Sequence, residues 1–320
     1  MRRARLEADL PGPEARRALS TLADVSQFLD LPAADLLPTP APDQATQVAM
    51  LTLTRDYVVK TIHKLPNFYA TRETVNFEGA PADAQGGELL SSKLEPLRET
   101  SRSTVTVLYR DNREMVAKNK GRGVSEKQMR TAGEFGPILA TVVKGAAKGR
   151  VVWSHWEQSA SGPLAVFRFE VPERASHYLV GFGNVGATGQ HGVDQRDPAY
   201  HGEIGVNVVD GSILRLTLIA EMNLGDPIEV ANLAVVYGPQ EIGGVTYICP
   251  VKSVAYSRTR RPVFEDDTNA RAAPFGSLGA PRDYLNEVLF THYHLFRAET
   301  RILTGSDEEP RTAVPASAPQ

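Results

Sequence analysis

Residues 204–221, which read IGVNVVDGSILRLTLIAE, carry the strongest indication of the fold. Asp210-Gly211 lies between two runs in which apolar residues recur at every second position, and it accepts the positive φ angles that a type I′ turn demands. Leu214, Leu216 and Leu218 therefore share one face of a pleated strand. The stretch predicts an antiparallel β-hairpin.

Similar patterns extend on both sides of this hairpin. Residues 228–237 and 245–257 flank Gly243-Gly244 and predict a second hairpin, in which Pro250 marks a bulge or an edge because proline cannot donate to a ladder. Asp111-Asn112 predicts a third tight turn. Further strands are expected over residues 68–77, 150–157, 164–171, 176–182 and 287–302, with long polar loops over 78–102 and 258–282.

Three stretches have helical spacing instead. In residues 14–30 the apolar positions Leu22, Val25 and Leu29 share one helical face, and four prolines within residues 31–43 predict an extended tether behind this helix. Two further helices are expected over residues 44–64 and 131–148.

These elements predict an α+β fold, because the strands are joined by short turns without regular strand-helix alternation. The expected architecture is a curled, half-barrel-like antiparallel β-sheet with two or three helices packed on it, plus the N-terminal helix on its proline-rich tether. Residues 1–43 would form that helix and linker, residues 44–303 the β-rich domain, and residues 304–320 a disordered tail.

The composition narrows the function classes. With 35 basic and 38 acidic residues the formal charge is −3, which argues against nucleic acid as the main partner. The single cysteine, Cys249, excludes an intrachain disulfide and a cysteine-rich metal site. Apolar runs are far too short for a transmembrane helix. Since the common enzyme motifs are missing too, the sequence predicts no cofactor and leans away from an enzyme.

Two patterns resemble functional motifs. Residues 181–186 (GFGNVG) match the dinucleotide fingerprint, but no helical pattern follows them, so a flexible glycine loop is the better interpretation. His292 and His294 lie two apart on the last expected strand, and with His191 and His201 they form a candidate metal site. Partly buried or rim histidines are the alternative interpretation.

The favoured function hypothesis is a non-catalytic protein that binds a lipid or acyl chain on the apolar face of the curled sheet. Packing in the core is the alternative role of the same side chains. A metal-dependent enzyme and a structural or assembly partner are the competing functions. The candidate trough residues are Phe167, Phe169, Leu214, Leu216, Leu218, Val230 and Phe290.

Several segments together resemble a family of uncharacterised, mostly secreted proteins of acidobacteria. The segments that carry the resemblance are 56–58 (DYV), 65–72 (LPNFYATR), 133–136 (GEFG), 166–169 (VFRF), 200–204 (YHGEI), 237–238 (YG), Pro250 and 286–288 (NEV). The resemblance implies a periplasmic or secreted protein with an export signal upstream of Met1, whereas the sequence by itself predicts a cytoplasmic one. The expected sheet is also similar in outline to the LolA-type half-barrel of lipoprotein carriers, which does not define a function.

Overall fold

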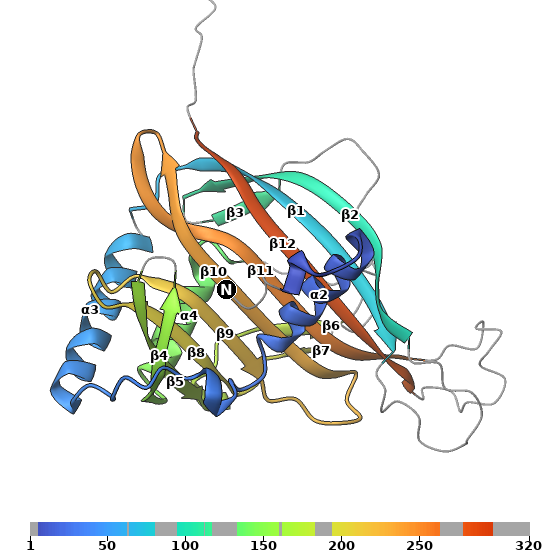
Figure 1. Cartoon of the computed structure of the whole chain (residues 1–320), viewed down its shortest axis with the longest axis horizontal. Coiled ribbons are helices and arrows are strands. Elements are labelled where there is room, and N and C mark those ends of the chain that lie inside the picture. Colours follow the sequence, from blue (N-terminus) through green and yellow to red (C-terminus); the bar gives the residue numbers. More distant parts are fainter. Residues whose placement is uncertain are drawn as a thin grey trace, which may run out of the picture.

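The computed structural model of the chain describes residues 6–62, 64–80, 95–111, 113–116, 133–159, 162–182, 194–262 and 278–296. Its main body is a ten-stranded β-sheet with the strand order β3-β2-β1-β12-β11-β10-β9-β8-β5-β4 (Figure 1). The strands of this sheet are β1 (Phe68–Ala80), β2 (Glu95–Arg110), β3 (Arg113–Val116), β4 (Arg150–Ser159), β5 (Gly162–Val171), β8 (Tyr200–Asn207), β9 (Ile213–Ala220), β10 (Ile228–Ile242), β11 (Val245–Pro262) and β12 (Leu278–Leu295). Two short strands, β6 (Val180–Phe182) and β7 (Asp194–Arg196), pair separately.

Neighbouring strands of the main sheet are antiparallel throughout. Its outer strands, β3 and β4, stand at opposite ends of the strand order, so the sheet is open. Few helices accompany it in the described part of the chain, among them α2 (Pro13–Ser26), α3 (Gln44–Ile62) and α4 (Pro137–Ala146), with 3₁₀ turns at Ala33–Asp35 and Glu173–Ala175. The expectation of a mainly antiparallel sheet with a small helical part is confirmed.

Helices α3 and α4 pack on one face of the sheet, which we call the inner face. Val58 of α3 and Val142 of α4 belong to one buried cluster with Phe167, Leu216 and Val235 of the sheet. Burial of apolar side chains contributes roughly 1.5–3 kcal/mol each. This cluster is the main core of the molecule.

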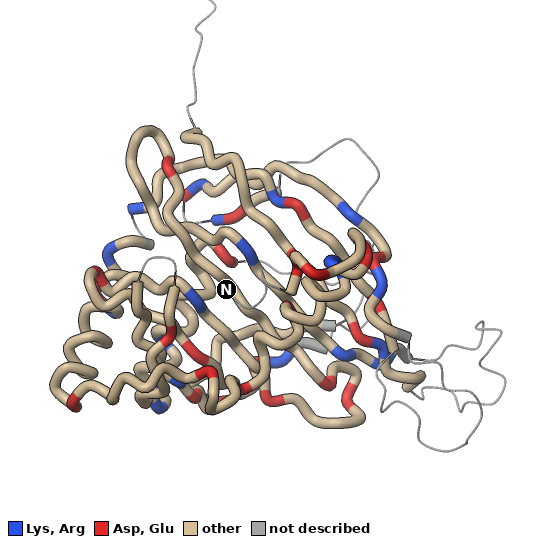
Figure 2. The backbone as a smooth tube through the Cα atoms, viewed as in Figure 1, with Lys and Arg blue, Asp and Glu red and all other residues tan. Residues whose placement is uncertain are grey.

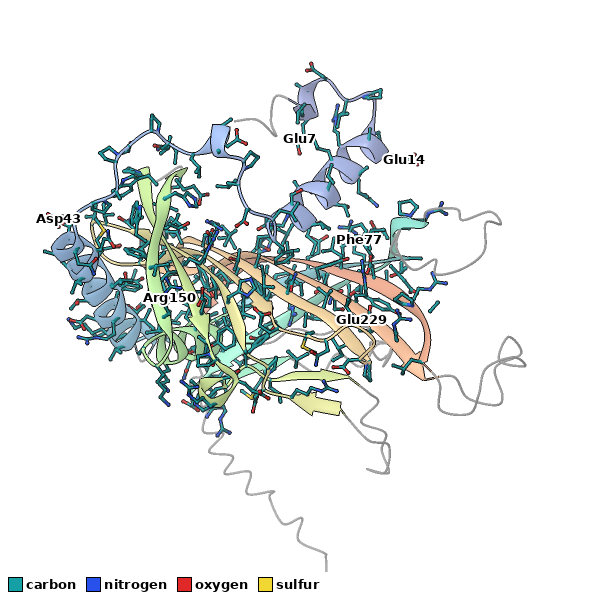
Figure 3. All side chains as sticks on the ribbon, turned by 90° about the horizontal axis from the view of Figure 1, so that it is seen from below. Glu7, Glu14, Asp43, Phe77, Arg150 and Glu229 are labelled. Carbon is teal, nitrogen blue, oxygen red and sulfur yellow. The ribbon has the colours of Figure 1, made fainter. Side chains whose placement is uncertain are left out.

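Helix α2 packs on the opposite face, which we call the outer face, and Figure 3 shows α2 and α4 on the two sides of the sheet. Its Val25 and the following Phe28 contact a cluster that contains Val254 and Leu285. The predicted apolar face of this helix is only partly correct, because Leu22 and Leu29 are 64% and 69% exposed. The side of α2 that faces the sheet instead contains Asp24, which is buried and forms an ion pair with a residue of the sheet.

The predicted hairpins form, although their turns differ in type. Gly243 and Gly244 have φ angles of 63° and 82° and join Ile242 directly to Val245, which is the two-residue turn with positive φ that suits a hairpin. In the 204–221 hairpin, by contrast, only Gly211 has positive φ, at 76°. The connection there spans residues 208–212, so the predicted type I′ turn is wrong.

The longer turn between β8 and β9 is stabilised by its polar side chains. Asp210 Oδ1 accepts hydrogen bonds from the backbone N–H of Ser212 at 2.9 Å and from its hydroxyl at 2.7 Å. The backbone N–H of Gly211 donates to the Asn207 carbonyl at 2.9 Å. These local bonds offer the chain an alternative to the tight turn.

Several strand ends lie elsewhere than expected. Strand β2 begins at Glu95 and β12 at Leu278, inside the two stretches expected to be polar loops, whereas residues 176–179 are not in a strand. Polar side chains on β2, such as the exposed Arg98 and Arg102, hide the period-two pattern there. Pro250 lies opposite Tyr237 beside a register shift, which confirms the bulge.

Candidate functional site

A groove of about 870 Å³ lies between the end of α2 and the outer face of β5, β8 and β9. Residues 27–30, just after α2, line it from above, and alternate residues of the three strands line it from below. We call it the outer groove. Its floor is polar because the apolar residues of the same strands, such as Phe167 and Phe169, point to the inner face.

Arg168 lies on the floor of the outer groove. Its Nη2 lies 2.7 Å from Asp30 Oδ1 above it and 3.3 Å from Glu203 Oε1 on the neighbouring strand. Glu203 also accepts hydrogen bonds from the Ser154 hydroxyl at 3.2 Å and from Arg215 Nη2 at 3.2 Å. This network fixes the floor, whereas the Asp30 side chain is 85% exposed and its ion pair is correspondingly weak.

The rim of the outer groove lies where β4 and β8 begin and where β5 and β9 end. Here His201 Nδ1 pairs with Glu221, and Arg150 Nη1 lies 3.9 Å from Glu170 Oε1. Lys148 and Arg174 line the same rim. Neither makes an ion pair with any residue in the described part of the chain. Within the described ranges, the rim therefore carries two positive side chains that form no ion pair with a carboxylate.

The surroundings of the outer groove carry mixed charge. Figure 2 shows basic and acidic residues interspersed along the strands, without one side of a single sign in that view. The residues that line the groove include four cations and four carboxylates, so the charges balance in number. Within the described residues, Lys148 and Arg174 are the lining cations that make no ion pair, whereas Arg150 and Arg168 each contact a carboxylate.

Most of the predicted trough residues lie on the inner face, where they are buried beneath α3 and α4. Phe167, Phe169, Leu216 and Leu218 are in one cluster at 0% exposure. The structure places the others as follows: Leu214 is buried on β9, Phe290 is buried in a second inner cluster with Phe68 and Tyr293, and Val230 lies opposite Arg258.

Val230 is on the other side of the sheet from the rest of that set. Its partner across the ladder, Arg258, pairs with Asp283 at 2.8 Å on the outer face. Leu233 and Val235 of the same strand are on the inner face, and Val230 is an odd number of positions from each, so plain alternation along β10 places it on the outer face. The register shift between Ile228 and Val230 affects the residues before Val230.

The predicted metal ligands are separated in the structure. His201 is the second residue of β8, whereas His292 and His294 lie near the end of β12, four positions away in the strand order. His191 lies outside the described residues. Four strand spacings correspond to roughly 19 Å. Within the described ranges, no group of three or more His, Cys, Asp or Glu side chains is arranged to hold a metal ion.

His292 also breaks the expected alternation of β12. Its φ angle is 51°, and the register of β1 and β12 shifts beside it. Phe290 and Tyr293, three residues apart, are consequently both buried, while His292 and His294 are exposed.

A buried ionic cluster lies on the inner face and was not predicted. Arg72 of β1 lies 3.5 Å from Glu114 of β3 and 3.7 Å from Glu134, which precedes α4. Ser253 donates to Glu134 at 3.3 Å, and the backbone N–H of Gly133 donates to Glu114 at 3.1 Å. Burial, together with the charge of Glu134, raises the pKa of Glu114 to about 7. The cluster ties the start of α4 to the sheet.

The fold and the site thus define an open antiparallel sheet with helices on both faces and a charged groove under α2. Comparisons with family models, with curated proteins and with solved structures find no match to this chain. Among the described helices none combines the length and the apolar character needed to cross a membrane.

The outer groove escaped sequence reasoning because its residues come from distant segments. Asp30 and Arg168, for example, are 138 residues apart. A usable signal was present, since Arg168 and Glu170 alternate with Phe167 and Phe169, and His201 and Glu203 repeat the pattern on β8. Charged side chains gathered on the polar face of adjacent strands would have indicated a polar site.

Proposed function

We propose that this protein is a non-catalytic, extracytoplasmic binding protein whose ligand is a small polar molecule held in the outer groove. One observation carries the proposal: a groove of about 870 Å³ in which charged side chains converge from separate strands under a sequence-distant roof. Ligand sites are typically concave and contain a few polar groups that orient the ligand. Location outside the cytoplasm rests on the family resemblance.

The arrangement of the groove supports binding in a further way. Its floor is held rigidly, because Glu203 joins Arg168 and Arg215 and its backbone N–H donates to the Thr217 hydroxyl at 3.0 Å. The roof is attached less firmly, through the exposed pair of Asp30 with Arg168. A rigid floor and a more weakly held roof suit a site that must admit and release a ligand.

Blocking the groove tests the proposal. Glu170 is half-exposed on its floor, so the change Glu170→Trp fills space without opening the core. Native mass spectrometry of the full chain, purified without detergent, should show a co-purifying small molecule in the wild type and its loss in this variant. Val209→Trp, on the exposed turn between β8 and β9, is the control and should retain the molecule. A molecule that both variants retain would contradict the proposal.

An apolar ligand on the inner face of a half-barrel is the second candidate. The observation in its favour concerns α3, which buries Val58 against the sheet and leaves Val48 and Val59 exposed at 52% and 59%. A helix with apolar residues on both sides could move away from the strip formed by Phe167 and Leu216. This candidate requires a lipid or acyl chain to co-purify, and Glu170→Trp would leave it bound.

A further inference from the structure

We propose that the outer groove binds an anion, a carboxylate or a phosphate group, at its rim, which Lys148, Arg150 and Arg174 line. The inference rests on the proposed function, because it names the chemistry of the ligand for the same groove. It depends on which of the four cations and four carboxylates that line the groove are paired with each other.

The three cations come from one end of the sheet. Lys148 follows α4, Arg150 begins β4, and Arg174 lies in the 3₁₀ turn just after β5. Figure 3 labels Arg150 on the strands that lie beneath the N-terminal segment. Because β4 and β5 are antiparallel neighbours, the start of the first strand and the end of the second are adjacent.

The carboxylates that line the groove equal its cations in number, but among the described residues they pair with only one of these three cations. Glu170 contacts only Arg150 among them, at 3.9 Å, and both side chains are more than half exposed. Glu221 is engaged by His201 instead. Within the described residues Lys148 and Arg174 have no carboxylate partner. Guanidinium and ammonium groups are the usual protein partners of carboxylates and phosphates.

The chain itself shows that this groove accepts a carboxylate. Asp30, from the segment above the sheet, places Oδ1 2.7 Å from Arg168 while remaining largely in solvent. Its negative charge sits at the roof of the same groove and opposes the entry of an anion. The Asp30 carboxylate pairs with Arg168 and not with the three rim cations, so it disfavours the ligand through its charge alone.

Titration calorimetry of the full chain with inorganic phosphate and, separately, with succinate tests the inference. At least one of the two anions should bind. Tighter binding of phosphate than of succinate would identify a phosphorylated ligand, and tighter binding of succinate would identify a carboxylate ligand. The double change Lys148→Gln, Arg174→Gln should weaken binding about 10-fold, which corresponds to about 1.4 kcal/mol for the loss of two exposed charge contacts. Added salt should weaken binding to the wild type as well.

Controls separate this inference from general charge effects. Lys60→Gln, Lys144→Gln removes two exposed lysines that do not line the groove and should bind as the wild type does. Asp30→Asn should bind the anion about 2- to 5-fold more tightly, and Glu14→Gln on α2 should not. Equal weakening by both double changes, or binding of neither anion, would overturn the inference. If in the second case a groove ligand still co-purifies and is lost with Glu170→Trp, the proposed function survives with a neutral or cationic ligand.

Discussion

Lys252 Nζ on β11 lies 2.7 Å from Asp24 Oδ1 on α2, although the two residues are 228 positions apart in the chain. Asp24 is 2% exposed, and the same ammonium group contacts Glu287 Oε1 at 2.8 Å. This ion pair holds α2 on the outer face. It therefore also positions residues 27–30, which follow α2 and form the roof of the outer groove.

Removing the ammonium group should detach α2. Lys252→Met leaves two carboxylates close together with little solvent, and breaking a buried ion pair in this way costs about 3–5 kcal/mol. Amide exchange in residues 13–26 should accelerate, with the sheet unchanged. Arg17→Gln breaks only the exposed pair with Glu99 and should have an effect below about 1 kcal/mol. Slow exchange in both variants would show that Val25 and Phe28 alone hold the helix.

The buried carboxyl of Glu114 should make stability depend on pH. Its pKa is about 7 in the folded protein and near 4.5 when the chain is unfolded, so the folded state binds the proton more tightly. The free energy of unfolding should therefore fall as the pH rises from about 4.5 to about 7. Urea unfolding at several pH values measures the slope.

Glu114→Gln should flatten that slope, because the amide does not titrate. The exposed Glu241 provides the control: Glu241→Gln should leave the pH dependence as it is in the wild type. An unchanged slope in Glu114→Gln would place the titration elsewhere than in the cluster of Arg72 and Glu134.

Contact between α3 and the β8–β9 turn can be tested at Gly211. A Cβ atom there would lie 2.7 Å from the backbone of Leu53, and the φ angle of 76° also disfavours a side chain. Gly225 has a similar φ of 85° but open space around it. Gly211→Ala should therefore destabilise by about 1–3 kcal/mol more than Gly225→Ala in urea unfolding. Equal losses would mean that α3 does not pack against this turn.

Cys249 should be unreactive in the native protein. Its side chain is 1% exposed, and burial raises the pKa of the thiol to about 12, so the reactive thiolate is scarce. A colorimetric thiol reagent should label it only after denaturation. Rapid labelling of the folded protein at pH 8 would show that the inner cluster around Phe68 and Tyr293 opens readily.

Local signals explain what could be predicted from the sequence. The turn at Gly243-Gly244 forms as expected because two glycines supply both positive φ angles within a few residues of the strands they join. Asp210-Gly211 does not form the expected two-residue turn. Ser212 donates two hydrogen bonds to the Asp210 carboxylate instead, which stabilises a longer connection. The sequence pattern predicted that the helices exist. It did not predict which side of α2 is buried, because the partner of Asp24, Lys252, is remote in sequence.

The candidate site was beyond sequence reasoning for the same reason. Asp30, Arg168 and His201 meet only after four strands and a tether are arranged in space. The histidines that share a spacing of two, His292 and His294, drew attention by proximity in sequence, yet a positive φ at His292 changes the alternation beside them. Bulges and long-range ion pairs, which sequence periodicity does not reveal, determine where these histidines lie and which residues form the outer groove.

Hydrogen exchange of the full chain with and without saturating phosphate tests most directly whether the ligand is held on the outer face under α2. The expected result is slower exchange in residues 27–30 and 199–203, with α3 and α4 unaffected. Slower exchange confined to residues 44–62 and 137–146, with no change beneath α2, would contradict the account and move the site to the inner face.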